Sequence, residues 1–380
     1  MFWFKQLSEN QILLIKFWLP ALLNGLLVWV LFLLLGDTPL IRSAGLALVI
    51  VGVTLSLRRM GSAIAVIGGL SLALSPAFWS QTGGNQGELA TIVIAIIFAS
   101  VAVLLAVVVS RRPYIGFGIG LLVFVVLFWS QIGTPRSIRL TGFVVGWLMY
   151  LLIDMLLLTN PRPEDAPMIL RAGELKTVDG TIPARSHHIY GILLLIVVGI
   201  INDPLLTILV PCIGLALSLT HTKLKWWYWG ALIAITLFGI RGIWLDYLIE
   251  QRHLLILNGW QQGTTWLNLI DLTVQQFTVF GIALSILGLA RLARWYPPLG
   301  TVSMVGFAAY WIFGTIYIGP QERILLLPMY VIFVLWMSYA VLAISEWFSR
   351  SFSLHPEVGR YLAIGLYGIL PAMLLYQILV

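Results

Sequence analysis

Charged side chains inside apolar stretches are the first residues of this sequence that could do chemistry. Asp154 lies within a long apolar run, and Arg241, Asp246 and Glu250 lie toward one end of another. A charge at the centre of a membrane costs about 2.5–3.5 kcal/mol on insertion scales, so these positions are informative. Asp246 and Glu250 are four residues apart and share a helix face, which Arg241 shares only in part. The three residues could line a solute-binding cavity, or they could reach the membrane surface.

The position of Asp154 and the lack of known catalytic or metal-binding motifs favour structural roles over catalysis. Asp154 has no basic residue at helical spacing, so it could pair with another helix or reach the surface near Asn160. The chain contains no CxxCH, HExxH or Glu-x-x-His motif, no P-loop, no dinucleotide fingerprint and no serine-centred elbow. The single cysteine, Cys212, lies in an apolar run and is expected to act as a small hydrophobe. The sequence therefore predicts neither a metal site nor a cofactor.

The elements that must position these groups are membrane helices. Of the 380 residues, 60% are hydrophobic and only 10% are charged. Apolar runs of about 20 residues, enough to cross a hydrocarbon core about 30 Å thick, recur along the chain. The net charge is +7, but the basic residues cluster at the ends of the runs. We therefore expect an all-α, polytopic transmembrane bundle whose basic residues meet membrane lipids and not nucleic acid.

The apolar windows predict about thirteen spans, and the first is expected to be retained because no cleavable small-residue site follows it. The predicted spans are 13–36, 40–57, 61–79, 89–110, 114–130, 139–159, 188–202, 204–220, 226–248, 273–293, 300–319, 324–347 and 361–380.

Basic residues in the short loops predict the orientation. With the N-terminus cytoplasmic, the inside loops carry pairs such as Arg58 with Arg59 and Arg111 with Arg112, whereas acidic residues gather in the outside loops. This alternation follows the positive-inside rule. It predicts a cytoplasmic N-terminus and a C-terminus outside.

One polar segment divides the predicted spans into two groups. Residues 1–159 form a half of six spans, 160–187 a proline-rich cytoplasmic linker, and 188–380 a half of about seven spans. On the outer side, the loop 250–271 mixes apolar and polar residues with two tryptophans. This composition predicts a helix lying in the membrane interface.

Two six-residue segments of the chain differ at a single position. FWSQTG (78–83) and FWSQIG (128–133) each end an outward-running span. An aromatic anchor followed by a polar turn suits the membrane surface, so the second copy needs no functional explanation. The first copy differs because Ser75 and Pro76 precede it and Glu88 follows it.

The surroundings of the first copy resemble a known family. GGLSLALSPAFWSQTGGNQGELATIVIAI (68–96) resembles the segment of GT-C membrane glycosyltransferases, in the bacterial branch related to protein O-mannosyltransferases, where a span ends in Ser-Pro-x-Phe-Trp and an acidic residue opens the next. QQFTVFGIALSILGLARLARWYPPLG (275–300) and YIGPQERILLLPMYVIFVLWMSYAVL (317–342) resemble the last block of that branch. Together these segments cover roughly a third of the chain, and they imply a protein of a bacterial inner (plasma) membrane.

The resemblance implies roles for three residues. Glu88 matches the acidic residue after the Ser-Pro-x-Phe-Trp turn, Asp37 the first catalytic acid, and Arg323 a contact to the phosphate of a polyprenyl-phosphate-linked sugar donor. The sequence departs from the family in its first outer loop, which is reduced to a few residues around Asp37 and is too short to shape an acceptor site. A single carboxylate on a tight turn provides neither a second acid nor a pocket wall.

Three functions are therefore open. The sequence favours a GT-C-like bundle with reduced catalysis, serving as a scaffold or accessory subunit beside other membrane subunits. The alternative is an active transferase using a polyprenyl-phosphate-linked sugar, with Asp37 and Glu88 as acids and Arg323 on the phosphate. A further alternative is a transporter of a small solute or lipid, with a cavity reaching Arg241 and Asp246.

Overall fold

The computed structural model describes most of the chain. The described residues are 18–82 without 37 and 39, the single positions 99, 100, 103, 118, 120 and 121, and the ranges 138–159, 186–220, 224–319, 321–352 and 355–380. This part of the chain is almost entirely helical and contains no strand, apart from an isolated antiparallel bridge between Leu255 and Tyr317.

Seven helices among the described residues are long and apolar enough to cross a membrane, and four shorter apolar helices accompany them. The long helices are α3 (Leu40–Leu57), α8 (Ile138–Thr159), α11 (Trp226–Ile243), α12 (Gly263–Trp295), α13 (Pro297–Ile316), α15 (Leu327–Ser351) and α16 (Pro356–Leu379). The shorter helices are α2 (Leu19–Leu35), α4 (Ser62–Ala73), α9 (Ser186–Asn202) and α10 (Val210–Ser218), the last preceded by η4 (Pro204–Leu209). The class predicted from composition, an all-α membrane protein, is confirmed.

Each of these eleven helices coincides with a predicted span, and the differences lie at their ends. The span predicted over 61–79 stops at Ala73 because Ser75, which precedes Pro76, is extended, and a separate helix α5 (Pro76–Trp79) follows. Helices α13 and α16 begin three and five residues before the predicted spans because proline is well tolerated in a first helical turn. The predicted spans 89–110 and 114–130 and nearly all of the linker 160–187 lie outside the described residues.

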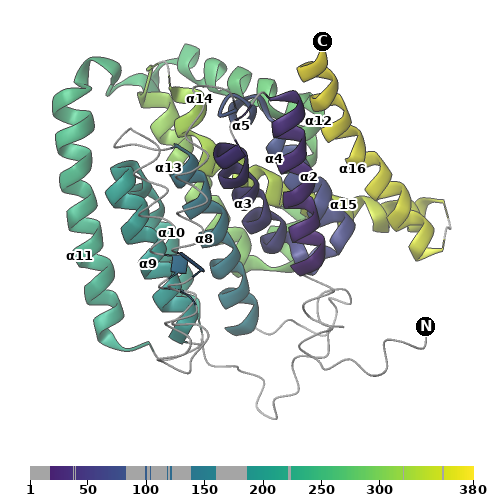
Figure 1. Cartoon of the computed structure of the whole chain (residues 1–380), viewed down its shortest axis with the longest axis horizontal. Coiled ribbons are helices and arrows are strands. Elements are labelled where there is room, and N and C mark those ends of the chain that lie inside the picture. Colours follow the sequence, from purple (N-terminus) through teal and green to yellow (C-terminus); the bar gives the residue numbers. More distant parts are fainter. Residues whose placement is uncertain are drawn as a thin grey trace.

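The segment 250–271, predicted to be an outer loop with one interfacial helix, contains several short elements. A π-helix (Trp244–Glu250) extends α11, and two 3-10 turns, η6 (Arg252–Leu254) and η7 (Gly259–Gln261), follow. Helix α12 then begins ten residues before the predicted span and is kinked at Thr278. Its first part lies across one end of the bundle (Figure 1), with the Trp266 indole donating to the Trp260 carbonyl.

Helix α15 is the centre of the bundle. Of its membrane-crossing window, 89% is buried inside the protein, against 17% for the peripheral helix α11 (Figure 1). It packs most extensively against α12, where Gly288 allows the two backbones to meet: a Cβ atom there would overlap the carbonyl oxygen of Trp336. Small residues at such a crossing are the usual means of close helix packing in membranes. One buried core joins residues from Val28 to Leu374 and so includes both predicted halves.

Charge divides the two ends of the bundle. The end of the bundle where α3 ends and α9 and α16 begin is called the basic end. The opposite end, which holds α5, the C-terminus and α14 (Glu322–Leu325), is called the far end (Figure 1). Among the described Lys, Arg, Asp and Glu residues, the basic end holds seven basic ones and three acidic ones. They are Arg58, Arg59, Lys225, Arg291, Arg294, Arg350 and Arg360, against Asp154, Glu346 and Glu357. The far end is nearly balanced, with Arg42, Arg241, Arg252 and Arg323 against Asp203, Asp246, Glu250, Asp271 and Glu322 among the residues whose side chains are described.

Candidate functional site

The Ser-Pro-x-Phe-Trp turn is held at the far end by a residue 199 positions away. Pro76 starts the short helix α5, which leaves the first backbone N–H groups without partners inside the helix. The N–H of Ala77 donates to Oε1 of Gln276 at 2.6 Å, in a fully buried contact. On the other side of the turn, the rings of Phe78 and Trp79 pack on Phe32 at 6.1 and 5.3 Å between centroids. The turn is thus fixed between α2 and α12.

The backbone beside Gln276 is strained. Thr278 has φ 61° and ψ 170°, a conformation that residues with a Cβ atom rarely adopt, and it interrupts α12. Two side-chain atoms here, Nε2 of Gln276 and Oγ1 of Thr278, are buried without a hydrogen-bond partner among the described residues. The hydroxyl of Tyr330, whose ring packs edge-on against Phe277, is a third such atom. Each unsatisfied buried polar group costs about 1–3 kcal/mol, so three together call for a functional explanation.

Arg323 is joined to the same part of α12. Its Nη2 donates to Oε1 of Gln275 at 2.8 Å, and Nε2 of Gln275 donates to Oδ2 of Asp271 at 2.7 Å. Glu322 precedes Arg323 and is half-buried, and this burial raises the pKa of its carboxyl from 4.5 to about 7. Glu322 and Arg323 both interact electrostatically with the hydroxyl of Tyr330. We call Gln275, Gln276, Thr278, Arg323 and Tyr330 the far-end polar cluster.

Two of the predicted site residues, Asp37 and Glu88, lie outside the described residues. Their described neighbours are informative. Gly36 lies against Thr82, since a Cβ atom on Gly36 would meet Cβ of Thr82 at 3.0 Å. Helix α5 also contacts both α12 and α14, the helix that carries Arg323. The chain flanking Asp37, the turn preceding Glu88 and Arg323 are therefore all brought to the far end.

The other two predicted residues lie at the same end on the periphery. Arg241 is exposed in the last turn of α11, and Asp246 is partly buried in the π-helix that follows. The next residue, Tyr247, is buried and donates through its hydroxyl to Oδ1 of Asp203 at 3.3 Å. Since α11 is the least buried of the long helices, Arg241 is not brought into the far-end polar cluster.

Asp154 lies at the basic end and pairs with two other helices. Its Oδ1 accepts hydrogen bonds from Nη2 of Arg58 at 2.7 Å and of Arg59 at 2.6 Å, and its Oδ2 contacts Nε2 of His188 at 3.0 Å. Arg58 also donates to the hydroxyl of Tyr150 at 3.1 Å. We call these five residues the Asp154 cluster. It joins the ends of α3, α8 and α9.

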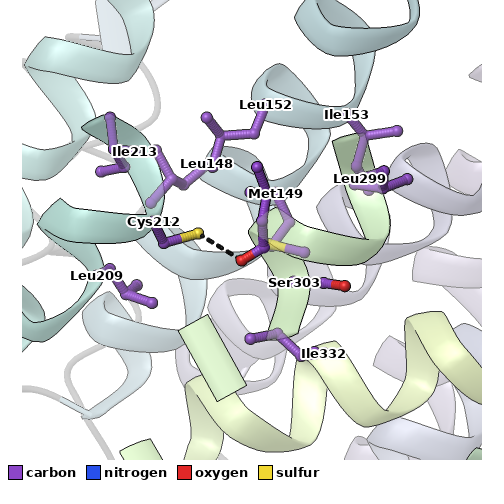
Figure 2. Close-up of a pocket in the computed structure, with 11 residues that line it drawn as sticks. Leu148, Met149, Leu152, Ile153, Leu209, Cys212, Ile213, Leu299, Ser303 and Ile332 are labelled. Carbon is purple, nitrogen blue, oxygen red and sulfur yellow. Dashed lines mark hydrogen bonds between the residues drawn. The ribbon is translucent and has the colours of Figure 1, made fainter. Parts of the chain in front are cut away.

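The core holds a small cavity of about 10 Å³, which is roughly the space of one water molecule. Figure 2 shows side chains of α8, α10, α13 and α15 around it, among them Leu148, Met149 and Ile332. The thiol of Cys212 donates to the carbonyl of Val302 at 3.3 Å. The lining is apolar apart from Cys212 and Ser303, so this cavity is a packing gap and not a solute site.

Within the described ranges, no group of three His, Cys, Asp or Glu side chains is arranged to hold a metal ion. Comparison of the chain with known protein families, curated proteins and solved structures found no match. The sequence analysis did not identify Gln275 and Gln276, although they open one of its two C-terminal resembling segments. Two consecutive amides beside an apolar run are the signal that could have identified them.

Proposed function

We propose that this chain is an integral membrane protein with a GT-C-like bundle that binds a polyprenyl-phosphate-linked sugar at its far end. One observation carries the proposal. The contacts of Gln276 with Ala77 and of Gln275 with Arg323 join the separate segments that resemble the family. Their meeting at one end depends on the fold and not on the sequence pattern that suggested the resemblance.

The chemistry of the far-end polar cluster suits such a ligand. The guanidinium of Arg323 is a strong donor to phosphate oxygens. Nε2 of Gln276 and the hydroxyl of Tyr330 are buried donors that need an acceptor. Sugar hydroxyl and phosphate oxygens provide one. In this proposal Asp37 and Glu88 are the acids that the family resemblance implies, the far end faces outside, and the basic end faces the cytoplasm of a bacterial inner membrane.

We infer that catalysis is reduced and that the protein serves as an accessory subunit beside other membrane subunits. The supporting observation is the connection from α2 to α3, which spans only four residues, 36–39. Glycosyl transfer needs a base within about 3 Å of the acceptor hydroxyl and a wall that excludes water. Four residues provide a turn but no wall. An active transferase is the second candidate, favoured by the contact of Gly36, next to Asp37, with Thr82 and by the contact of α5 with α14, the helix that carries Arg323.

The binding proposal is tested with the full chain in mild detergent and farnesyl-phosphate-linked mannose as probe. Losing one charge-assisted hydrogen bond costs about 1.5–3 kcal/mol, so Arg323→Gln should weaken binding about tenfold or more. The matched control is Arg252→Gln, another exposed arginine at the far end. Farnesol, which lacks the phosphate, should bind wild type and Arg323→Gln alike. Equal probe affinity in wild type and Arg323→Gln would refute the assignment.

A transfer assay separates the two roles. A transferase would move mannose from the probe to an acceptor. The double change Asp37→Asn with Glu88→Gln should then abolish this transfer while probe binding persists. Binding without transfer, together with a co-purifying membrane protein, would support the accessory role. Purification of the chain as a lone species in mild detergent would count against that role.

A further inference from the structure

We propose that residues 263–277, the first part of α12, form a cover that lifts about Thr278 to let a ligand into the far-end polar cluster. The inference rests on the proposed function, because it describes how the sugar-lipid reaches that site. Nε2 of Gln276 and the hydroxyl of Tyr330, the two buried donors of the cluster, have no acceptor among the described residues. Gln276 and Tyr330 are both 0% exposed, so a ligand can bond to them only after part of the chain moves.

The cover lies over Tyr330. Phe277, its last residue, packs its ring edge-on against the Tyr330 ring at 5.8 Å between centroids. Earlier in the cover, Leu269 packs against α13, since a Cβ atom on Gly314 would meet its Cδ1 at 2.8 Å. Figure 1 shows this part of α12 crossing one end of the bundle. The cover is therefore the segment that has to move for Tyr330 to become accessible.

Few contacts hold the cover in place. Its buried residues among 263–277 are Leu269, Thr273, Gln276 and Phe277. Its outer tie is the hydrogen bond from Arg323 to Gln275, which is exposed to water, and its inner tie is the bond from the Ala77 N–H to Gln276. Segments with few buried apolar contacts and exposed hydrogen bonds are the ones that open at the lowest cost in free energy.

Thr278 is placed to act as the hinge. Its φ of 61° and ψ of 170° lie in a region that is essentially restricted to glycine. Residues held in such conformations are concentrated in ligand clamps and switch regions. A change of φ and ψ at this one position would redirect the cover while the rest of α12 stays packed on α15, where Gly288 meets the Trp336 carbonyl.

A disulfide that fastens the cover to α13 tests the motion. In the lock variant, Leu269→Cys with Gly314→Cys, the new side chain at 314 takes the space that the leucine methyl groups leave. Neither position belongs to the far-end polar cluster. The full chain in mild detergent is titrated with farnesyl-phosphate-linked mannose before and after reduction. The oxidised lock variant should bind at least about tenfold more weakly than its reduced form, because affinity falls with the fraction of molecules that are open.

The matched control is a disulfide away from the cover. A Cβ atom on Gly306 would lie 3.7 Å from Cβ of Cys212, and disulfides join Cβ atoms about 3.5–4.5 Å apart. Gly306→Cys therefore links α13 to α10 through the native cysteine. Its oxidised and reduced forms should bind the probe equally.

Thiol labelling measures the cover without any ligand. Tyr330→Cys places a thiol beneath Phe277, where a water-soluble methanethiosulfonate reaches it only when the cover lifts. Adding Gln275→Ala, which removes the outer tie, should raise the labelling rate at least about threefold. Adding Gln377→Ala instead, at an exposed glutamine of α16, should leave the rate unchanged. The wild type, whose single thiol on Cys212 is buried, gives the background rate.

The two measurements separate this inference from the proposed function. Equal probe affinity of the oxidised and reduced lock variant, or a labelling rate that stays at background or does not respond to Gln275→Ala, would overturn the cover and leave the sugar-lipid proposal intact. Labelling that responds as expected, in a protein that binds no probe in either the wild type or the reduced lock variant, would refute the sugar-lipid and support the cover. If the disulfide does not form, the labelling rates decide.

Discussion

Removing the carboxylate at the basic end should be among the most destabilising single changes in this protein. Asp154→Asn keeps the shape of the side chain and one acceptor oxygen but removes the negative charge that the guanidinium groups of Arg58 and Arg59 share. Removing one partner of a buried ion pair costs about 3–5 kcal/mol. Asp154 is only 8% exposed, but the arginine side chains retain some access to water. We therefore expect the lower limit, a loss of about 3 kcal/mol in the free energy of unfolding.

The loss is measured by unfolding in mixed micelles of dodecyl maltoside and SDS, followed by tryptophan fluorescence. Glu250→Gln, which changes an exposed carboxylate at the far end, should stay within about 0.5 kcal/mol of wild type. Asp154→Asn combined with Arg59→Gln should cost less than the sum of the single changes by about 0.5–3 kcal/mol, because the two groups are in contact. Additive effects, or a loss below 1 kcal/mol for Asp154→Asn, would refute the view that this carboxylate compensates the arginines.

Two further predictions concern the crossing of α12 with α15 and the far end. Gly288→Ala places a methyl group against the Trp336 carbonyl and should cost at least about 1–3 kcal/mol in the same assay, whereas Gly365→Ala, in open space on α16, should be neutral or slightly stabilising. Burial raises the pKa of Glu322 to about 7, so the folded protein binds a proton there that the unfolded chain releases near pH 4.5. The contribution of Glu322 to stability should therefore be lost as the pH rises from about 4.5 through 7. Glu322→Gln should reduce this dependence when unfolding midpoints at pH 5 and 8 are compared.

The sequence predicts the positions of the described helices well because their signal is local. Apolar length determines which stretches become helices, and eleven of the predicted spans are helices in the structure. Helix ends are less accurate where proline acts, as at Ser75 before Pro76, because the change of backbone conformation there is smaller than a hydropathy window. The kink at Thr278 has no local signature, since threonine is not a residue that favours a positive φ.

Partners remote in sequence are beyond the reach of pattern analysis. Asp154 bonds Arg59 across 95 positions, and Gln276 bonds Ala77 across 199. Sequence reasoning singled out Asp154 as a charge within an apolar run and left open whether another helix would pair with it. It gave Gln276 no role, because an uncharged amide in an apolar run is not by itself unusual. Which residues contact one another depends on how the helices pack, and this packing cannot be inferred from the pattern of a single sequence.

The two clusters differ in how their polar groups are satisfied. In the Asp154 cluster the carboxylate contacts Arg58, Arg59 and His188, and these contacts join three helices. In the far-end polar cluster, Nε2 of Gln276 and the hydroxyl of Tyr330 are buried without an acceptor among the described residues. Under the proposed function, a ligand rich in hydroxyl and phosphate oxygens provides such acceptors. The proposed function therefore predicts different consequences for the two clusters: Arg323→Gln should weaken binding of the sugar-lipid probe, whereas Asp154→Asn should lower the stability of the bundle.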